Sequence, residues 1–197
     1  ALGNLEGVLL DNGGVPRYGP DSKGAFMFRM PERYAERFVE AGFDFLSMAN
    51  NHTLDFGVDA IGSTMRTLKK AGIAYAGVQD MCDYAIVERD GVRYGLCAFA
   101  PNLLMCDMRN LELGEKRVKQ LREEHKCDIV IVSVHAGAEG NGATHVTRRD
   151  EIFTVFKARY FCKRVRFVGG FQFRCEQAAL LHWLRCQARI DARRAQE

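Results

Sequence analysis

Short apolar segments alternate with amphipathic ones along most of this chain, and that alternation restricts the fold more than any other feature. The strongest strand signal is residues 127–134, whose near-continuous apolar run is typical of a strand covered on both faces. The other segments are, in chain order, a helix at 31–41, a strand at 43–49, a helix at 58–71, a strand at 73–78 and a charged helix at 114–126.

A hairpin interrupts this order. Residues 84–87 and 92–98 flank Asp90-Gly91, a pair that favours a tight turn between antiparallel strands. Strands that alternate with helices, with a hairpin among them, predict an α/β layered fold with mainly parallel pairings.

The segment after about Phe153 differs in composition. Residues 154–197 hold 10 Lys and Arg against 3 Asp and Glu, although the whole chain has a net charge of only +3. Residues 167–173 resemble neither a good helix nor a cleanly bounded strand, and a helix is predicted from about 176 to 194. We therefore expect two parts, a domain at 1–152 and a divergent basic tail at 153–197. No nucleic-acid partner is expected, because only the basic tail would favour one.

The cysteines and the hydropathy bear on three further features. Seven cysteines at irregular spacing, with no C-x-x-C pair, predict neither a zinc knuckle nor a disulfide framework. Cys97 and Cys127 lie inside apolar strand-like runs and are expected to be core thiols. No apolar run approaches the roughly 20 residues that a membrane-spanning helix needs.

Polar side chains stand at three predicted strand ends. Asn50-Asn51-His52 follows the strand at 43–49, His135 follows the strand at 127–134, and Asn4 and Glu6 lie just before an apolar run. In open α/β sheets, ligands collect at the carboxyl ends of strands. Carboxylate, amide and imidazole groups suit Mn, Fe, Zn or Mg better than copper. These residues therefore predict a metal site.

Simpler interpretations of the same residues exist. A single histidine at a strand end is often a hydrogen-bonded structural residue. Asn50-Asn51-His52 could be a turn that caps the next helix. Asn4 and Glu6 could belong to a solvated edge.

Several of these motifs resemble the CapA family of capsule synthesis proteins, over roughly residues 1–152. The resemblance is carried by Asn4-Leu5-Glu6-Gly7, by Ala49-Asn50-Asn51-His52 with Asp55-Phe56-Gly57, and by Val134-His135-Ala136-Gly137. Such proteins are similar to calcineurin-like metallophosphatases. The resemblance therefore implies a layered α-β-β-α sandwich, incomplete here, with a centre of divalent Mn, Fe or Zn ions, two in the complete fold.

The resemblance also implies roles for individual residues. Glu6 would contact or bridge the metals, Asn51 would be the amide ligand of the second metal and His135 a further ligand. His52 would assist the leaving group or steady the transition state. Asn4, Glu139 and His145 are further candidates with less support. An anionic or phosphoryl-containing substrate and membrane-associated capsule synthesis partners are implied, at the bacterial cell surface for the full-length family. The location of this chain itself stays open.

Two motifs of the family do not occur in this sequence, namely an opening Gly-Asp element and a closing Gly-His-x-x-His element. We therefore expect one weakly bound metal ion or none, and less than full activity. Three hypotheses follow: a metal-dependent phosphoesterase-like hydrolase, a non-catalytic scaffold for surface polymer assembly, and a truncated or frame-shifted inactive gene product.

Overall fold

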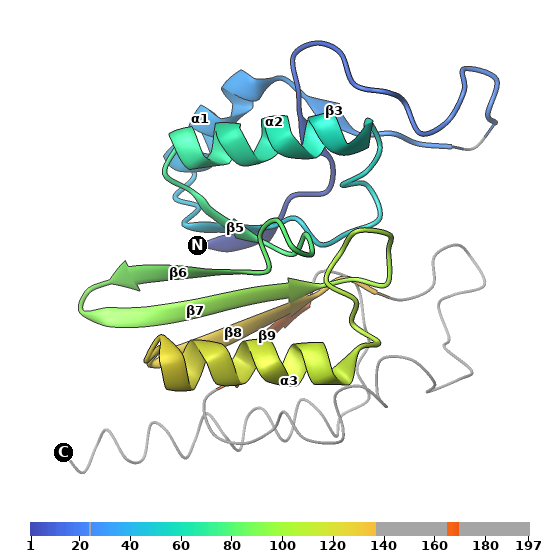
Figure 1. The fold of residues 1–197 in the computed structure, drawn as a ribbon. Coiled ribbons are helices and arrows are strands. Elements are labelled where there is room, and N and C mark those ends of the chain that lie inside the picture. The colour runs from blue at the N-terminus through green and yellow to red at the C-terminus, as the bar shows by residue number, and fades with distance from the viewer. Residues whose placement is uncertain (24, 137–164, 170–197) are drawn as a thin grey trace, which may run out of the picture.

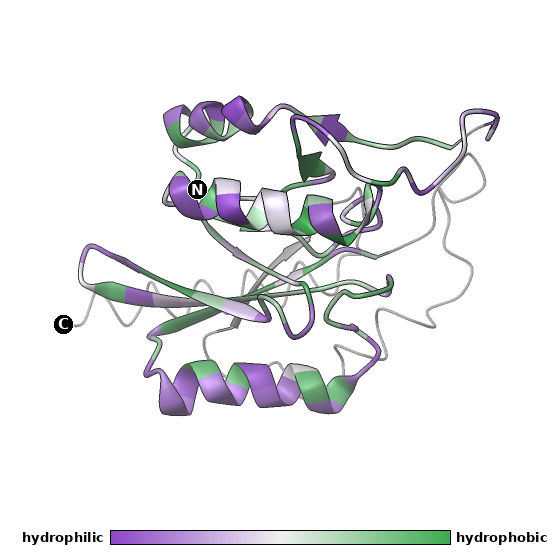
Figure 2. Ribbon diagram, turned by 45° about the horizontal axis from the view of Figure 1, so that its top comes forward, coloured by the Kyte–Doolittle hydropathy of each residue, from purple (hydrophilic) through white to green (hydrophobic). Residues whose placement is uncertain are grey.

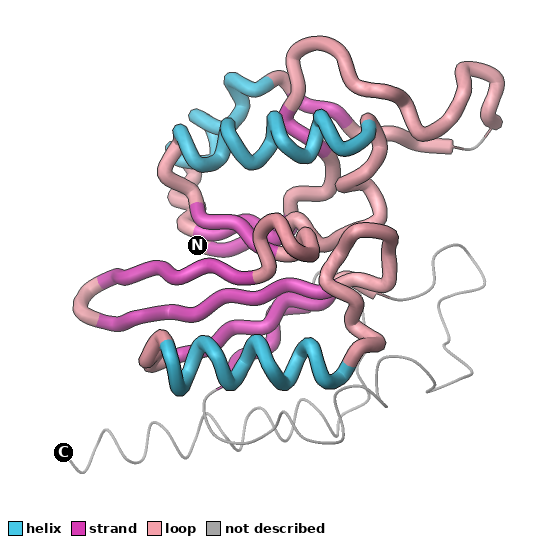
Figure 3. Tube along the Cα trace, in the orientation of Figure 1, coloured by secondary structure: helices cyan, strands magenta, loops and turns pink. Residues whose placement is uncertain are grey.

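The computed structural model of the chain describes residues 1–23, 25–136 and 165–169, the last five as backbone only. The described elements form four layers, helix, sheet, sheet and helix, as Figure 1 shows. In Figure 3 the helices lie on the outside and the two main sheets lie between them. The predicted α/β class and α-β-β-α layering are thus confirmed.

The first layer pair consists of a parallel sheet covered by two helices. Its strands run in the order β1-β4-β5, and β4 is wholly buried. The strands are β1 (Leu2–Asn4), β4 (Phe45–Ser47) and β5 (Ala74–Ala76), and the helices are α1 (Ala35–Glu40) and α2 (Gly57–Lys70). Ile61 and Leu68 lie two turns apart on α2 and are fully buried in the core beneath it, as expected for one face of an amphipathic helix.

The second sheet has the order β6-β7-β8-β9. Its strands are β6 (Tyr84–Arg89), β7 (Val92–Phe99), β8 (Ile129–Val134) and β9 (Val165–Gly169). Strands β6 and β7 are antiparallel, whereas β7 with β8 and β8 with β9 are parallel. Asp90 and Gly91 both adopt positive φ in the predicted hairpin turn.

Strand β8 is covered on both faces, as its apolar run predicted. Ile131 packs in the core shared with the first sheet, while Val130 and Val132 pack with Leu121 beneath the last helical layer. That layer consists of α3 (Leu111–Lys119) and a π-helical continuation at Gln120–Glu124. Figure 2 shows hydrophilic and hydrophobic residues on different sides of α3. Among the described residues, no helix has the length and apolarity to cross a membrane.

A small parallel pair, β2 (Val8–Leu9) with β3 (Arg29–Met30), lies beside α2. The described residues between the two strands, 11–23 and 25–28, form a long loop. A short 3-10 helix (Glu32–Tyr34) leads from β3 into α1.

Residues 165–169 form strand β9, so a strand includes the start of the 167–173 segment, whose sequence resembles neither a good helix nor a cleanly bounded strand. All five residues of β9 pair with β8. Such pairing can impose a strand where the local sequence pattern is weak. The helix predicted from about 176 lies outside the described residues.

Candidate functional site

The polar motifs meet because two parallel strands end together. β1 and β4 pair with Asn4 opposite Ser47, so that the segments following both strands emerge at one edge of the first sheet. The loop after β4 carries Asn51, and the end of β8 in the second sheet carries His135. These two residues are 84 positions apart in sequence, yet His135 Nε2 lies 2.8 Å from Asn51 Oδ1.

Asn50 joins the two strand ends. Its side chain is 1% exposed. Its Nδ2 donates to Asn4 Oδ1 at 3.1 Å and to the carbonyl of Leu5 at 2.8 Å. Its Oδ1 accepts from the backbone N–H of His52 and from the hydroxyl of Thr53, both at 3.0 Å. Every hydrogen-bonding position of this amide is therefore used, which fixes the loop relative to β1.

The imidazole of His52 is held on three sides. Its Nδ1 lies 2.7 Å from Oδ2 of the buried Asp55, and the same oxygen accepts from the backbone N–H of Phe28 at 2.8 Å. The Phe28 ring packs on the imidazole with 4.1 Å between centroids. On the far side, Nε2 lies 3.9 Å from Oε1 of Glu6. This arrangement puts the ring proton of neutral His52 on Nδ1 and leaves Nε2 facing the Glu6 carboxylate.

Glu6 itself is anchored through Asn4, whose Nδ2 donates to Glu6 Oε2 at 3.1 Å. A continuous chain of contacts thus runs from Glu6 through Asn4 and Asn50 to the loop that carries His52. The carboxylate is about a quarter exposed, so a small molecule can approach it.

The predicted residues in the described part of the chain fall into one neighbourhood. Asn4 and Glu6 are linked to His52 through Asn50. Asn51, the chain neighbour of His52, contacts His135. Glu139 and His145 lie outside the described residues.

Two of the simpler interpretations fare less well, whereas a hydrogen-bonded structural role for a strand-end histidine agrees with the bond between His135 and Asn51. Helix α2 has Phe56 at its N-cap position and no side-chain capping hydrogen bond, so Asn50-Asn51-His52 does not cap it. Asn4 and Glu6 are half-buried and hydrogen-bonded to each other, which is unlike a freely solvated edge.

Sequence reasoning missed three contributors. Asp55 was seen only as part of a motif, although its spacing of three residues from His52 could have indicated a contact. Phe28 and Arg17 come from the loop at 11–28, and Arg17 Nη1 donates to the carbonyl of Asn51 at 3.2 Å. No local pattern signals such a contact between a loop and a distant turn.

Two of the predicted ligands lie at about the spacing of two donors on one metal ion. Two donors at about 2.1 Å from one ion and at right angles to each other are about 3 Å apart. Asn51 Oδ1 and His135 Nε2 are close to that spacing, and the Glu6 carboxylate lies beside the same loop. Within the described ranges, however, no group of three or more His, Cys, Asp or Glu side chains is placed to hold a metal ion. A two-metal centre therefore does not follow from these residues.

Comparisons with known proteins identify one family and several relatives. The profile of the family described as "Bacterial capsule synthesis protein PGA_cap" matches residues 1–152. The uncharacterized protein y4sH of Sinorhizobium fredii is 37% identical over 136 residues, which are 62% of this chain and 28% of that protein. The capsule biosynthesis protein CapA of Bacillus anthracis is 26% identical over 124 residues, 55% of this chain and 30% of that protein.

Among solved structures, a candidate 5′-nucleotidase of Staphylococcus aureus, in complex with alpha-ketoglutarate, is 13% identical. It matches 70% of this chain and 30% of its own length, with a TM-score of 0.46. The chain spans less than a third of the length of the curated relatives that it matches.

Proposed function

Because the chain belongs to the bacterial capsule synthesis protein family, we propose that it acts as a metal-dependent phosphoesterase-like hydrolase in capsule or poly-γ-glutamate biosynthesis. The observation that carries the proposal is the approach of His135 Nε2 to Asn51 Oδ1, 2.8 Å apart, next to the His52–Asp55 pair. The four-layer fold supports the calcineurin-like metallophosphatase type.

In this proposal the residues divide into ligands and a proton donor. Asn51, His135 and Glu6 would hold a divalent Mn, Fe or Zn ion, which would polarise a phosphoryl oxygen and lower the pKa of a bound water towards neutrality. The Asp55 carboxylate accepts a hydrogen bond from Nδ1–H of His52, which fixes the orientation of the ring. In its doubly protonated form, His52 would give the Nε2 proton to the leaving oxygen of an anionic, phosphoryl-containing substrate.

A second function also has support. Because no group of three His, Cys, Asp or Glu side chains is placed to hold a metal among the described residues, a non-catalytic scaffold for surface polymer assembly fits the same fold. Such a scaffold would work with membrane-associated capsule synthesis partners.

Metal titration followed by an activity assay tests the proposal. We expect the purified chain to bind about one Mn²⁺ in calorimetry. Asn51→Ala and His135→Ala should each weaken that binding about tenfold or more. His125→Ala is the matched control. His125 lies before β8 and forms a hydrogen bond with Tyr84, whereas His135 follows β8.

Hydrolysis of a generic phosphodiester separates the hypotheses. Turnover that requires Mn²⁺ and is lost in His52→Ala supports the hydrolase. Mn²⁺ binding through Asn51 and His135 without turnover would contradict catalysis by this chain. If neither Mn²⁺ binding nor turnover occurs, the hydrolase proposal is wrong and the scaffold is favoured.

A further inference from the structure

The loop at residues 11–28 is built onto the candidate site. The backbone N–H of Val15 donates to the carbonyl of Phe56 at 3.0 Å, and that of Arg17 donates to the carbonyl of Asp55 at 2.8 Å. These bonds attach the loop to the turn that ends the His52 segment.

Glycine makes this attachment possible. Gly14 has φ of +80°, and a Cβ at this position would lie 2.9 Å from the carbonyl oxygen of Phe56. A side chain there would therefore force the two segments apart. The close contact is a specific property of this sequence.

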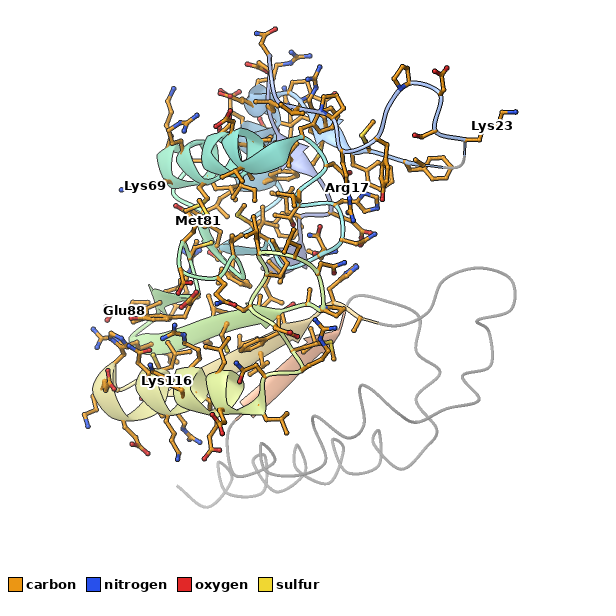
Figure 4. The ribbon with its side chains drawn as sticks, turned by 45° about the vertical axis from the view of Figure 1, so that its right-hand side comes forward. Arg17, Lys23, Lys69, Met81, Glu88 and Lys116 are labelled. Carbon is orange, nitrogen blue, oxygen red and sulfur yellow. The ribbon has the colours of Figure 1, made fainter. Side chains whose placement is uncertain are left out.

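The attachment brings a cation to the site. The Nη1 of Arg17 donates to the backbone carbonyl of Asn51, and the side chain of Asn51 contacts His135. The bond to the carbonyl occupies one of the five N–H groups of the guanidinium, and Arg17 is exposed to solvent. Figure 4 shows Arg17 against the body of the domain, whereas Lys23 lies at the outer end of the same loop.

We propose that Arg17 binds the phosphoryl oxyanion of the substrate at the Asn51–His52 site, as a specificity-determining residue supplied by the loop at 11–28. A planar guanidinium suits this task, because two parallel N–H groups can bind two phosphoryl oxygens. The contacts of Arg17 with the backbone carbonyls of Asn51 and Asp55 hold this residue against the turn that carries His52. The inference rests on the proposed function for the identity of the substrate, but oxyanion binding can be measured alone.

The experiment measures binding of inorganic phosphate at constant ionic strength, with and without Mn²⁺, by calorimetry or by NMR shifts of the backbone. Arg17→Gln should weaken phosphate binding about tenfold or more, as expected for loss of a charge-assisted hydrogen bond. Lys23→Gln removes the same charge from the same loop and should change binding less than twofold. Arg17→Lys should restore part of the affinity.

Several outcomes would overturn the inference. One is the absence of phosphate binding by the unaltered chain. Another is equal loss in Arg17→Gln and Lys23→Gln, which would indicate only a general charge effect. A third is a lower melting temperature in Arg17→Gln with unchanged phosphate affinity, which would make Arg17 a brace for the turn. Failure of Mn²⁺ to bind would instead count against the proposed function, while Arg17-dependent phosphate binding without metal would leave the oxyanion site in place.

Discussion

At the scale of single residues, the site depends on side chains that touch no substrate in the proposed mechanism. Asn50 uses its whole amide to connect two strand ends, and Asp55 orients His52 while also accepting from the loop. Both are 1% exposed. Substituting buried polar groups of this kind is costly, because their partners cannot form replacement hydrogen bonds with water.

Asn50→Asp should destabilise the fold. The change replaces two N–H donors by an acceptor that faces Asn4 Oδ1 and the carbonyl of Leu5. We expect a loss of about 2–4 kcal/mol in the free energy of unfolding. Urea denaturation measures it. Asn12→Asp, at an exposed loop position, should stay within about 0.5 kcal/mol, and equal effects of the two changes would contradict the role given to Asn50.

Asp55→Asn should change the protonation of His52. With the carboxylate present, the neutral ring carries its proton on Nδ1, and the ¹⁵N shifts of the ring nitrogens report this tautomer. The variant should populate both tautomers and lose about 1–3 kcal/mol of stability. Asp59→Asn, an exposed change at the start of α2, is the control. A ring proton found on Nε2 of neutral His52 in the unaltered chain would refute the pairing.

At the scale of elements, the site lies where segments of the chain come unusually close. Gly77 follows β5 with φ of +120°, and a Cβ there would lie 2.6 Å from the Cβ of Ala49. Ala49 directly precedes Asn50, so the close approach of Gly77 and Ala49 positions the start of the polar turn relative to β5.

Gly77→Ala should therefore cost more than Gly91→Ala. Both glycines have positive φ, but a Cβ at Gly91 would meet nothing within 4 Å. Gly91→Ala should cost about 1 kcal/mol from backbone strain alone. Gly77→Ala adds a clash and should lower the melting temperature further, by several degrees. The order of the two melting temperatures, measured by circular dichroism, decides the point.

The elements themselves follow from sequence more readily than their partners. Spacing of apolar residues predicted α2 to within one residue at each end, and Asp90-Gly91 predicted the hairpin. The strand at 165–169 escaped notice because its pairing with β8 is a long-range effect. The contacts of Arg17 and Phe28 escaped for the same reason, since they depend on how a loop folds back over a turn 27 to 34 residues away.

At the scale of the whole molecule, two sheets have to pack for the site to exist. The ends of β1 and β4 belong to the first sheet and the end of β8 to the second, and the shared core joins them through residues such as Leu46 and Ile131. The hydrogen bond between Asn51 and His135 is thus an indicator of correct packing. Strand-end reasoning predicted this meeting, whereas the roles of the residues in metal binding stay a proposal.

Because a buried thiol resists ionisation, the free energy of unfolding depends on pH in the alkaline range. Burial raises the pKa of Cys97 from 9.0 to about 12, so the unfolded chain releases this proton first as the pH rises. The stabilisation is complete below about pH 9 and is lost progressively as the pH rises towards 12. Between pH 9 and 11 the urea midpoint should fall, and Cys97→Ala should show a shallower fall, by up to about 1.4 kcal/mol per pH unit. A slope unchanged by this substitution would contradict the burial of the thiol.

The central claim is that side chains from strand ends far apart in the sequence bind one metal ion together. Its most direct test is the paramagnetic broadening of histidine ring signals by substoichiometric Mn²⁺, with the signals assigned by substitution. The account predicts that the signals of His52 and His135 broaden together, while that of His125, before β8, stays sharp. Broadening of only one of the pair, or of all three alike, would contradict it.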